Sequence, residues 1–298
     1  MNHTKNTPVA PTGDTRVLRK NLLGMRSSRL VGNTLVYVVL ALGLVMVLAP
    51  FLMMFLNSFK NTRESALFKI SWSATSSLDN YRGIISNKSF WRGMGNSLLI
   101  TISTVLVTNT AAAMGAFFIQ RMGNRLAKTA YFLFFAGLVV PISIIPTIKV
   151  MQWLQLHNTY PGIVLFYTAT NMPFTIFLLT GFMKSVPREL DEAALIEGSS
   201  YFRLFTQIIV PLLITPLITS SIVITTNVWN DFFAPFYLIS STKKQPIVIS
   251  IHRFVSMYGT DWGVVFAFMV MVIAPVLLIY AFLQRYIIDG LTSGSLKG

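Results

Sequence analysis

The chain has 298 residues, of which 53% are hydrophobic and only 11% are charged, and its 24 basic and 10 acidic residues give a net charge of +14. A soluble domain carries about 25% charged residues, so this composition leaves too little polar surface for a soluble globule. The basic residues lie between long apolar runs and do not form one polar module, which argues against nucleic-acid binding. The chain has no cysteine, which excludes disulfides and thiolate metal sites. We therefore expect an all-α integral membrane protein.

The predicted elements begin with a basic tail over residues 1–30, which we expect to lie in the cytoplasm because positive segments stay on that side. A spanning helix needs about 20 mostly apolar residues. Apolar stretches with few charges predict six membrane helices, near 34–56, 97–119, 129–150, 162–183, 208–229 and 263–283. Prolines inside the apolar stretches predict kinks, at Pro141, Pro146, Pro173, Pro216 and Pro275. The six helices make one transmembrane domain over 31–285, and 286–298 is a cytoplasmic tail.

Three longer connections separate these helices: 60–96 and 230–262 outside, and 184–207 inside. No phosphate-binding loop and no nucleophile motif occurs in the chain, and its three histidines are scattered, so we predict no catalytic and no metal site. The charge-free stretches that define the spans also disfavour an ion-coupled carrier, because such carriers generally place a charged group near the midplane.

The inside loop 184–207 carries the clearest local signal. Pro187 suits the first turn of a helix, and Gly198 supplies a left-handed residue that would end it. Three acidic side chains favour the positive N-terminal end of that helix: Glu189, Asp191 and Glu192. Four residues recur at helical spacing, and the two alanines among them predict a small, flat stripe on one face: Leu190, Ala193, Ala194 and Glu197. A second short helical stretch, 201–207, leads into the fifth span. A short helix with a flat face suits insertion into a groove of another protein.

The spacing Glu192-Ala193-Ala194, then Gly198, then Ile208-x-x-Pro211 resembles the EAA loop of ABC-importer permeases, with Val210 in place of the usual leucine. Further segments resemble the sugar-importer branch of that family: Pro187-x-x-Leu190-Asp191, Asn96-Ser97, Trp229-Asn230-Asp231-Phe232 and the C-terminal Gly290-x-x-x-Gly294-Ser295-x-Lys297-Gly298. The chain is most similar to the six-span permease of maltose-type importers.

The resemblance implies a transmembrane subunit of an ATP-driven importer of oligosaccharides in a prokaryotic cell membrane, with both termini in the cytoplasm. It implies four kinds of partner besides the bilayer: a second homologous permease, two ATPase subunits, an extracytoplasmic solute-binding protein and the sugar. ATP and Mg²⁺ would be bound by the ATPase subunits, so this chain would need no cofactor and would not be an enzyme. A cytoplasmic coupling helix would contact the ATPase through Glu192, Ala193, Ala194, Gly198, Asp191 and Arg203.

Polar residues within or beside the spans are candidates for the translocation pathway or its gate: Asn109, Asn171, Thr225, Thr226, Asn227, Trp229 and Asn230. Interhelical hydrogen bonding is an alternative role for the amides and hydroxyls, and anchoring at the membrane interface is an alternative for Trp229. Because the predicted spans carry no charge apart from Lys149 near the end of 129–150, a neutral sugar is the simplest cargo. Two rival functions stay open, an ion-coupled secondary sugar carrier and a membrane scaffold without transport.

Overall fold

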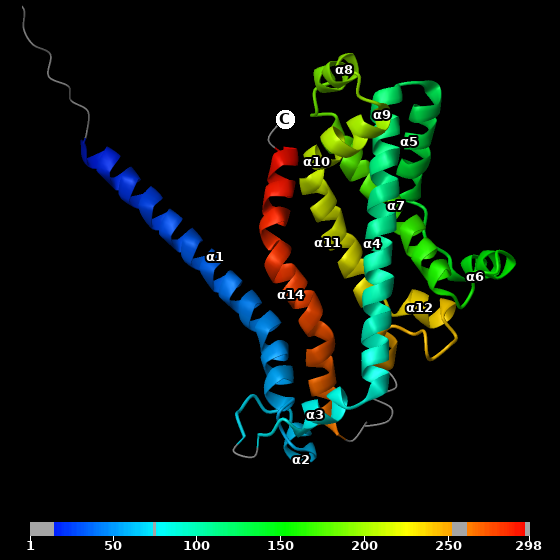
Figure 1. Ribbon diagram of the computed structural model, residues 1–298. Helices are drawn as coiled ribbons and strands as arrows, with labels where there is room; N and C mark the ends of the chain where they lie inside the picture. Colours follow the sequence, from blue (N-terminus) through cyan, green and yellow to red (C-terminus); the bar gives the residue numbers. More distant parts are fainter. Residues whose placement is uncertain (1–14, 74–75, 252–260, 296–298) are drawn as a thin grey trace, which may run out of the picture. The chain divides into compact units, whose positions relative to one another are not determined.

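The structure is a computed structural model that describes residues 15–73, 76–251 and 261–295, with side chains from residue 33 to residue 282. All regular elements in these ranges are helices (Figure 1). The described chain divides into two compact units, which separate between Met53 and Met54. The predicted tail segment 1–14 and the last residues 296–298 lie outside the described residues.

The first unit is the greater part of α1 (Thr15–Asn57), whose stretch Asn33–Asn57 is long and apolar enough to cross a membrane. The second unit contains the other helices: α2 (Thr62–Ser65), α3 (Asp79–Ile85), α4 (Lys88–Met122), α5 (Arg125–Gly137), α6 (Ile144–Trp153), α7 (Tyr160–Met183), α8 (Glu189–Ile196), α9 (Tyr201–Arg203), the π-helix η1 (Leu204–Ile209), α10 (Val210–Leu212), α11 (Ile214–Asn230), α12 (Phe233–Leu238) and α14 (Trp262–Ser295).

The long helices of the second unit pack side by side. α4 contacts α7 and α11, α11 also contacts α14, and α5 packs on α7 and α4. In Figure 1, α8 and α9 lie at one end of these helices, and α2 and α3 lie at the opposite end. The loop 184–207 and the described parts of the loops 60–96 and 230–262 therefore lie at opposite ends of the helix bundle, as the alternation of predicted spans requires.

Four helices in the described part of the chain are long and apolar enough to cross a membrane on their own: Asn33–Asn57, Lys88–Met122, Tyr160–Met183 and Trp262–Phe282. These correspond to the first, second, fourth and sixth predicted spans. The predicted single helix over 129–150 is wrong. α5 ends at Gly137 and α6 begins at Ile144. Pro141 explains this break, because its backbone nitrogen has no hydrogen to donate and its ring would clash with the carbonyl of Gly137, four residues earlier.

The fifth predicted span, 208–229, is bent. Tyr201–Leu212 and Ile214–Asn230 meet at 73°. Pro216 explains the break by the same rule, since the carbonyl four residues before it is that of Leu212, where α10 ends. The preceding Pro211 follows a π-helical turn, η1, which lies inside the segment that the sequence predicts as an ordinary helix.

Candidate functional site

The helix that the EAA-like motif predicts is α8. Glu189, Asp191 and Glu192 occupy its first turn, where the helix dipole favours acidic groups. At its C-terminus, Gly198 has φ +83, and the amide of Ser199 donates to the carbonyl of Ala194 at 2.9 Å. The amide of Gly198 donates to Leu195 at 3.1 Å. This pair of bonds is a Schellman motif, so the predicted left-handed role of Gly198 is confirmed.

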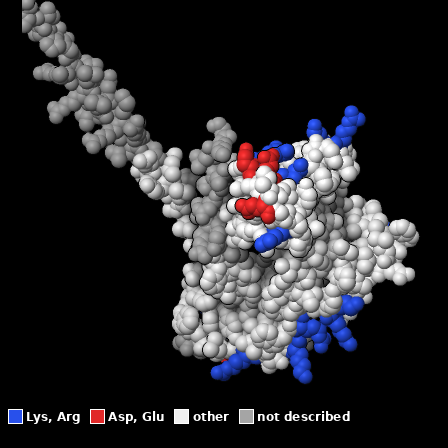
Figure 2. All heavy atoms as spheres, turned by 45° about the horizontal axis from the view of Figure 1, so that its top comes forward, with Lys and Arg blue, Asp and Glu red and all other residues white. Residues whose placement is uncertain are grey.

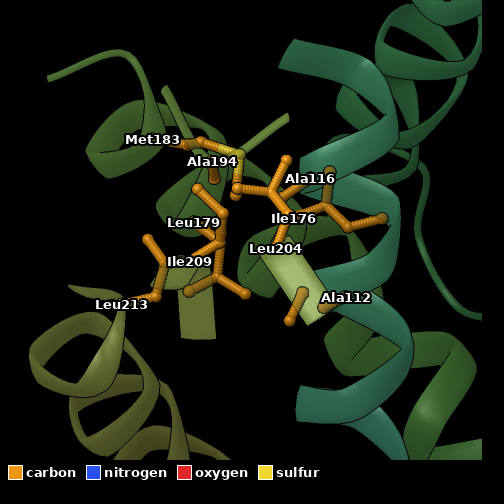
Figure 3. Packing of buried hydrophobic residues seen from close by; sticks show 10 residues of the cluster. Ala112, Ala116, Ile176, Leu179, Met183, Ala194, Leu204, Ile209 and Leu213 are labelled. Atoms are coloured by element: carbon orange, nitrogen blue, oxygen red, sulfur yellow. The ribbon is translucent and has the colours of Figure 1, made fainter. Parts of the chain in front are cut away.

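One face of α8 is buried against the bundle. Ala194 is 5% exposed and lies in an apolar cluster formed by α4, α7 and the η1 segment (Figure 3). Figure 3 shows Ala112 and Ala116 of α4, Leu179 and Met183 of α7, and Leu204 and Ile209 of η1 as members of this cluster. The predicted single stripe is wrong in one respect: Ala193 and Glu197 are exposed whereas Ala194 is buried, so the two alanines face different surroundings.

A buried ion pair connects α8 to the end of α4. Nε of Arg121 lies 2.6 Å from Oδ2 of Asp191, and each of the two side chains is 13% exposed. Nη2 of Arg121 also donates to Oδ1 of Asp191 at 3.2 Å, and the guanidinium reaches the carbonyl of Val186 at 3.4 Å. Asp191 was predicted as an ATPase contact. In the structure it holds α8 on α4, because its carboxylate faces Arg121 inside the chain.

The opposite face of α8 is free in the described chain. Glu192 and Ala193 are exposed, and Ile196 is 86% exposed. Beyond Gly198, Tyr201 and Phe202 are 68% and 77% exposed. Figure 2 shows acidic side chains gathered at this end of the molecule with basic side chains beside them. Exposed large apolar residues among charges are typical of a protein interaction surface. Arg203 is exposed nearby, and its Nε donates to Gln207 at 2.8 Å.

Polar side chains join α4 and α11 within the bundle. Asn109 Nδ2 donates to Ser221 Oγ at 2.7 Å, and Asn109 Oδ1 accepts from Ser220 Oγ at 2.5 Å. The Asn109 amide is therefore satisfied by helix–helix hydrogen bonds, the alternative role that the sequence left open.

A second polar pair joins α7 to α11. Asn227 Nδ2 donates to Asn171 Oδ1 at 3.1 Å, and Asn171 is buried whereas Asn227 is exposed. Thr226 and Asn230 are exposed as well, and Thr225 is half-buried. The exposed face of α11 is thus polar near the end that leads to α12. Lipid tails offer polar groups no hydrogen bonds, so such a face suits water, a polar solute or another protein.

Trp229 does not share that face. It is 3% exposed, it packs in a cluster with Phe90 and Phe268, and its Nε1 donates to the carbonyl of Val272 in α14 at 3.3 Å. Val272 lies one turn before Pro275, where the proline withholds a backbone donor. The structure therefore places Trp229 in helix packing, away from the exposed polar face and from an exposed interface position.

Three anchoring residues at the end opposite α8 were missing from the sequence-based candidates for the site. Asp231 accepts from the hydroxyl of Tyr167 at 3.0 Å, and its other oxygen accepts from the amide of Phe233 at 2.8 Å. Asn96 Nδ2 donates to the carbonyls of Lys243 and Gln245 at 2.9 and 3.0 Å. These contacts fix α12 and the 230–262 loop to α7 and α4.

Part of this anchoring had a signal in the sequence. Asn96 and Asp231 both stand in segments that resemble the importer family, but the resemblance gives no contact partner for either. Arg121 was recognisable in the sequence only as a single cation at the end of an apolar stretch.

In the part of the chain that the structure describes, no group of three His, Asp or Glu residues could hold a metal ion.

Comparisons with known proteins bear on this arrangement. The profile of the family described as binding-protein-dependent transport system inner membrane component matches residues 109–293. The chain is 31% identical over 271 residues to the probable ABC transporter permease protein YurM of Bacillus subtilis (strain 168), covering 90% of each chain. It is 29% identical over 265 residues to the probable starch degradation products transport system permease protein AmyC of Thermoanaerobacterium thermosulfurigenes, covering 88% of this chain and 97% of that protein.

A solved structure has the same fold. It is the crystal structure of a bacterial ABC transporter involved in the import of the acidic polysaccharide alginate. One of its chains superposes with a TM-score of 0.74 at 20% sequence identity, covering 94% of this chain and 99% of that chain.

Proposed function

The chain belongs to the family of binding-protein-dependent transport system inner membrane components, and from this premise we propose that it carries an oligosaccharide across the membrane as one half of a permease pair. It is an ABC transporter permease and not an enzyme, so ATP hydrolysis is the task of partner ATPase subunits. The observation that carries the proposal is the shape of α8: one face is bonded to α4 and packed on the bundle, and the other presents Glu192 and Ile196 to the surroundings.

We infer that α8 transmits movement between the ATPase and the spans. A helix held by a buried ion pair and by the packing of Ala194 moves together with α4 and α7 as a rigid body. The exposed face, with Ile196 as its most prominent apolar side chain, is the part that we propose enters a groove of the ATPase. Asp191 then acts as a positioning residue within this chain, and Glu192, Ala193 and Gly198 keep their proposed role in coupling.

An oligosaccharide cargo is supported by the polar face of α11. Thr226, Asn227 and Asn230 are exposed there and offer hydroxyl and amide groups without a formal charge. The curated relative AmyC is described as a permease for starch degradation products, which is consistent with this cargo. We propose that this face meets the sugar at the contact with the second permease, and that Asn171 positions Asn227 from behind.

The proposed topology has six spans, with the third formed by α5 and α6 together and the fifth by the bent Tyr201–Asn230 segment. In this topology the α8 end faces the cytoplasm, and both termini lie on the same side as α8. The 230–262 loop and the 60–96 loop would then face the solute-binding protein outside an inner membrane.

Glu192→Lys tests the coupling role directly. Because Glu192 is exposed on the free face of α8, reversing its charge should leave the fold intact and reduce the amount of ATPase that co-purifies with the chain. Asp79→Lys is the matched control, since its side chain is 74% exposed at the opposite end. Equal ATPase recovery with Glu192→Lys and with the control would contradict the proposal.

A further inference from the structure

A pocket of about 340 Å³ opens beside the ends of α4, α5 and α7, and its lining includes neither Glu192 nor Ile196 of the α8 face proposed to bind the ATPase. Its lining includes Lys128 and Phe132 of α5 and Lys184 and Arg188 from the segment after α7. Gln120 of α4 forms part of its wall: Gln120 Nε2 donates to the carbonyl of Thr180 at 3.2 Å, and the Gln120 carbonyl accepts from Arg188 Nη2 at 2.9 Å. These bonds hold the wall in place without a ligand.

The charge of the pocket is positive. Lys128, Lys184 and Arg188 are all exposed, and no acidic residue lines the pocket. Among the described residues, none of these three cations has a carboxylate partner. Three cations around one pocket without a counter-ion favour an anionic group, and a phosphate accepts hydrogen bonds from such donors.

One side of the pocket is apolar and continues along the bundle. Phe132 is 67% exposed, and Tyr131 stacks on Phe135 with ring centroids 6.4 Å apart. The ring centroids of Phe135 and Phe177 of α7 lie 6.2 Å apart, and both residues are 46% exposed. A strip of aromatic rings therefore leads from the basic pocket toward the middle of the apolar helices. A soluble anion would gain nothing from this strip, whereas an acyl chain would pack on it.

We propose that this pocket binds the headgroup of an anionic phospholipid, with Lys128, Lys184 and Arg188 around the phosphate and an acyl chain along Phe132, Phe135 and Phe177. The proposed topology is needed only to assign this lipid site to the cytoplasmic leaflet of the membrane. α4 and α7 end at this level, and basic pockets between spans on the cytoplasmic side are suited to anionic headgroups.

Native mass spectrometry of the purified full chain tests the proposal. The delipidated protein is titrated with phosphatidylglycerol, with phosphatidylcholine as the zwitterionic comparison. We expect tighter binding of phosphatidylglycerol, and we expect Lys128→Gln with Lys184→Gln to weaken it about 25-fold, about fivefold for each charge removed. Arg125→Gln is the matched control, because Arg125 is exposed on the same helix without lining the pocket. Lys184→Gln alone provides a milder variant if the double variant is unstable.

Three results would overturn the lipid site: unchanged phosphatidylglycerol affinity in the double variant, an equal loss in Arg125→Gln, or displacement of the lipid by excess inorganic phosphate. The last would identify a soluble-anion site. The measurement needs neither ATPase nor sugar, so a failure of the proposed transport function would leave the lipid result unaffected, and the reverse also holds.

Discussion

Gly198 is the residue of the loop 184–207 whose backbone adopts a left-handed conformation. Its φ of +83 is unfavourable for any side chain, but no atom lies within 4 Å of the position that a Cβ would occupy. Substitution is therefore opposed by the backbone conformation and not by crowding. The sequence predicts this role because glycine at the end of a short helix has a well-defined geometry.

Gly198→Ala should destabilise the loop by about 1 kcal/mol, and Gly198→Val by more, because a Cβ disfavours the left-handed region. The expected consequence is a misaligned α8 and reduced ATPase binding with normal insertion in the membrane. Gly181→Ala in α7 is the control, since it also has open space but no positive φ. If both substitutions leave ATPase binding at the wild-type level, strain at Gly198 has no part in coupling.

Asp191 and Arg121 show a different relation between sequence and site. The position of Asp191 in the motif predicts a functional residue, but its partner lies 70 positions away in the chain, and no local pattern connects the two. Only the packing of α4 against α7 and α8 brings Arg121 within reach. The sequence could therefore give the importance of Asp191 but not its role within the chain.

Removing one member of this pair leaves the other nearly buried without a counter-charge, which costs about 3 kcal/mol. We expect Asp191→Asn to lower thermal stability and to uncouple ATP hydrolysis from uptake. The double exchange Asp191→Arg with Arg121→Asp should recover part of both properties. The readout is the ratio of sugar imported to ATP hydrolysed. An unchanged ratio in Asp191→Asn would mean that the pair has no positioning role.

At the scale of elements, periodicity and charge were sufficient for the long helices but not for their interruptions. α4, α7 and α14 each contain the corresponding predicted segment, because one uninterrupted apolar run defines each of them. The prolines were recognised as sites of kinks. Their effects differ, however. Pro173 and Pro275 lie inside continuous helices, whereas Pro141 lies between α5 and α6, and Pro216 lies in the first turn of α11, directly after the break from α10. Tertiary packing determines whether a proline is accommodated in a continuous helix or interrupts it, and this packing cannot be read from a single sequence.

The 230–262 loop allows a test of docking to the solute-binding protein. Lys243 is exposed at its tip, while its carbonyl accepts from Asn96. Lys243→Gln should therefore weaken stimulation of ATPase activity by the loaded binding protein, and more so at low salt, without disturbing the loop. Deleting Ser241–Gln245 would also remove both bonds to Asn96, so the point substitution is the cleaner variant. Arg125→Gln serves as the control, because Arg125 is exposed at the α8 end and lines no proposed site. Full stimulation of the Lys243→Gln variant at low salt would argue against a docking role for this tip.

At the scale of the whole molecule, the proposed topology is testable because the chain has no cysteine of its own. Glu197→Cys and Thr242→Cys each place a single thiol at an exposed position, at opposite ends of the bundle. In intact cells an impermeant thiol reagent should modify Thr242→Cys, and it should modify Glu197→Cys only after the membrane is opened. Labelling of Glu197→Cys in intact cells would reverse the orientation of α8.

ATP hydrolysis by partner subunits is proposed to move a sugar through this chain. The most direct measurement is uptake of a labelled oligosaccharide into proteoliposomes that contain the purified transporter and its loaded binding protein. The two conditions to compare are ATP supplied on the α8 side with ionophores present, and an imposed ion gradient without ATP. We predict ATP-dependent uptake that ionophores leave unchanged, and loss of that uptake in Glu192→Lys. Uptake driven by the ion gradient in the absence of ATP would contradict the account.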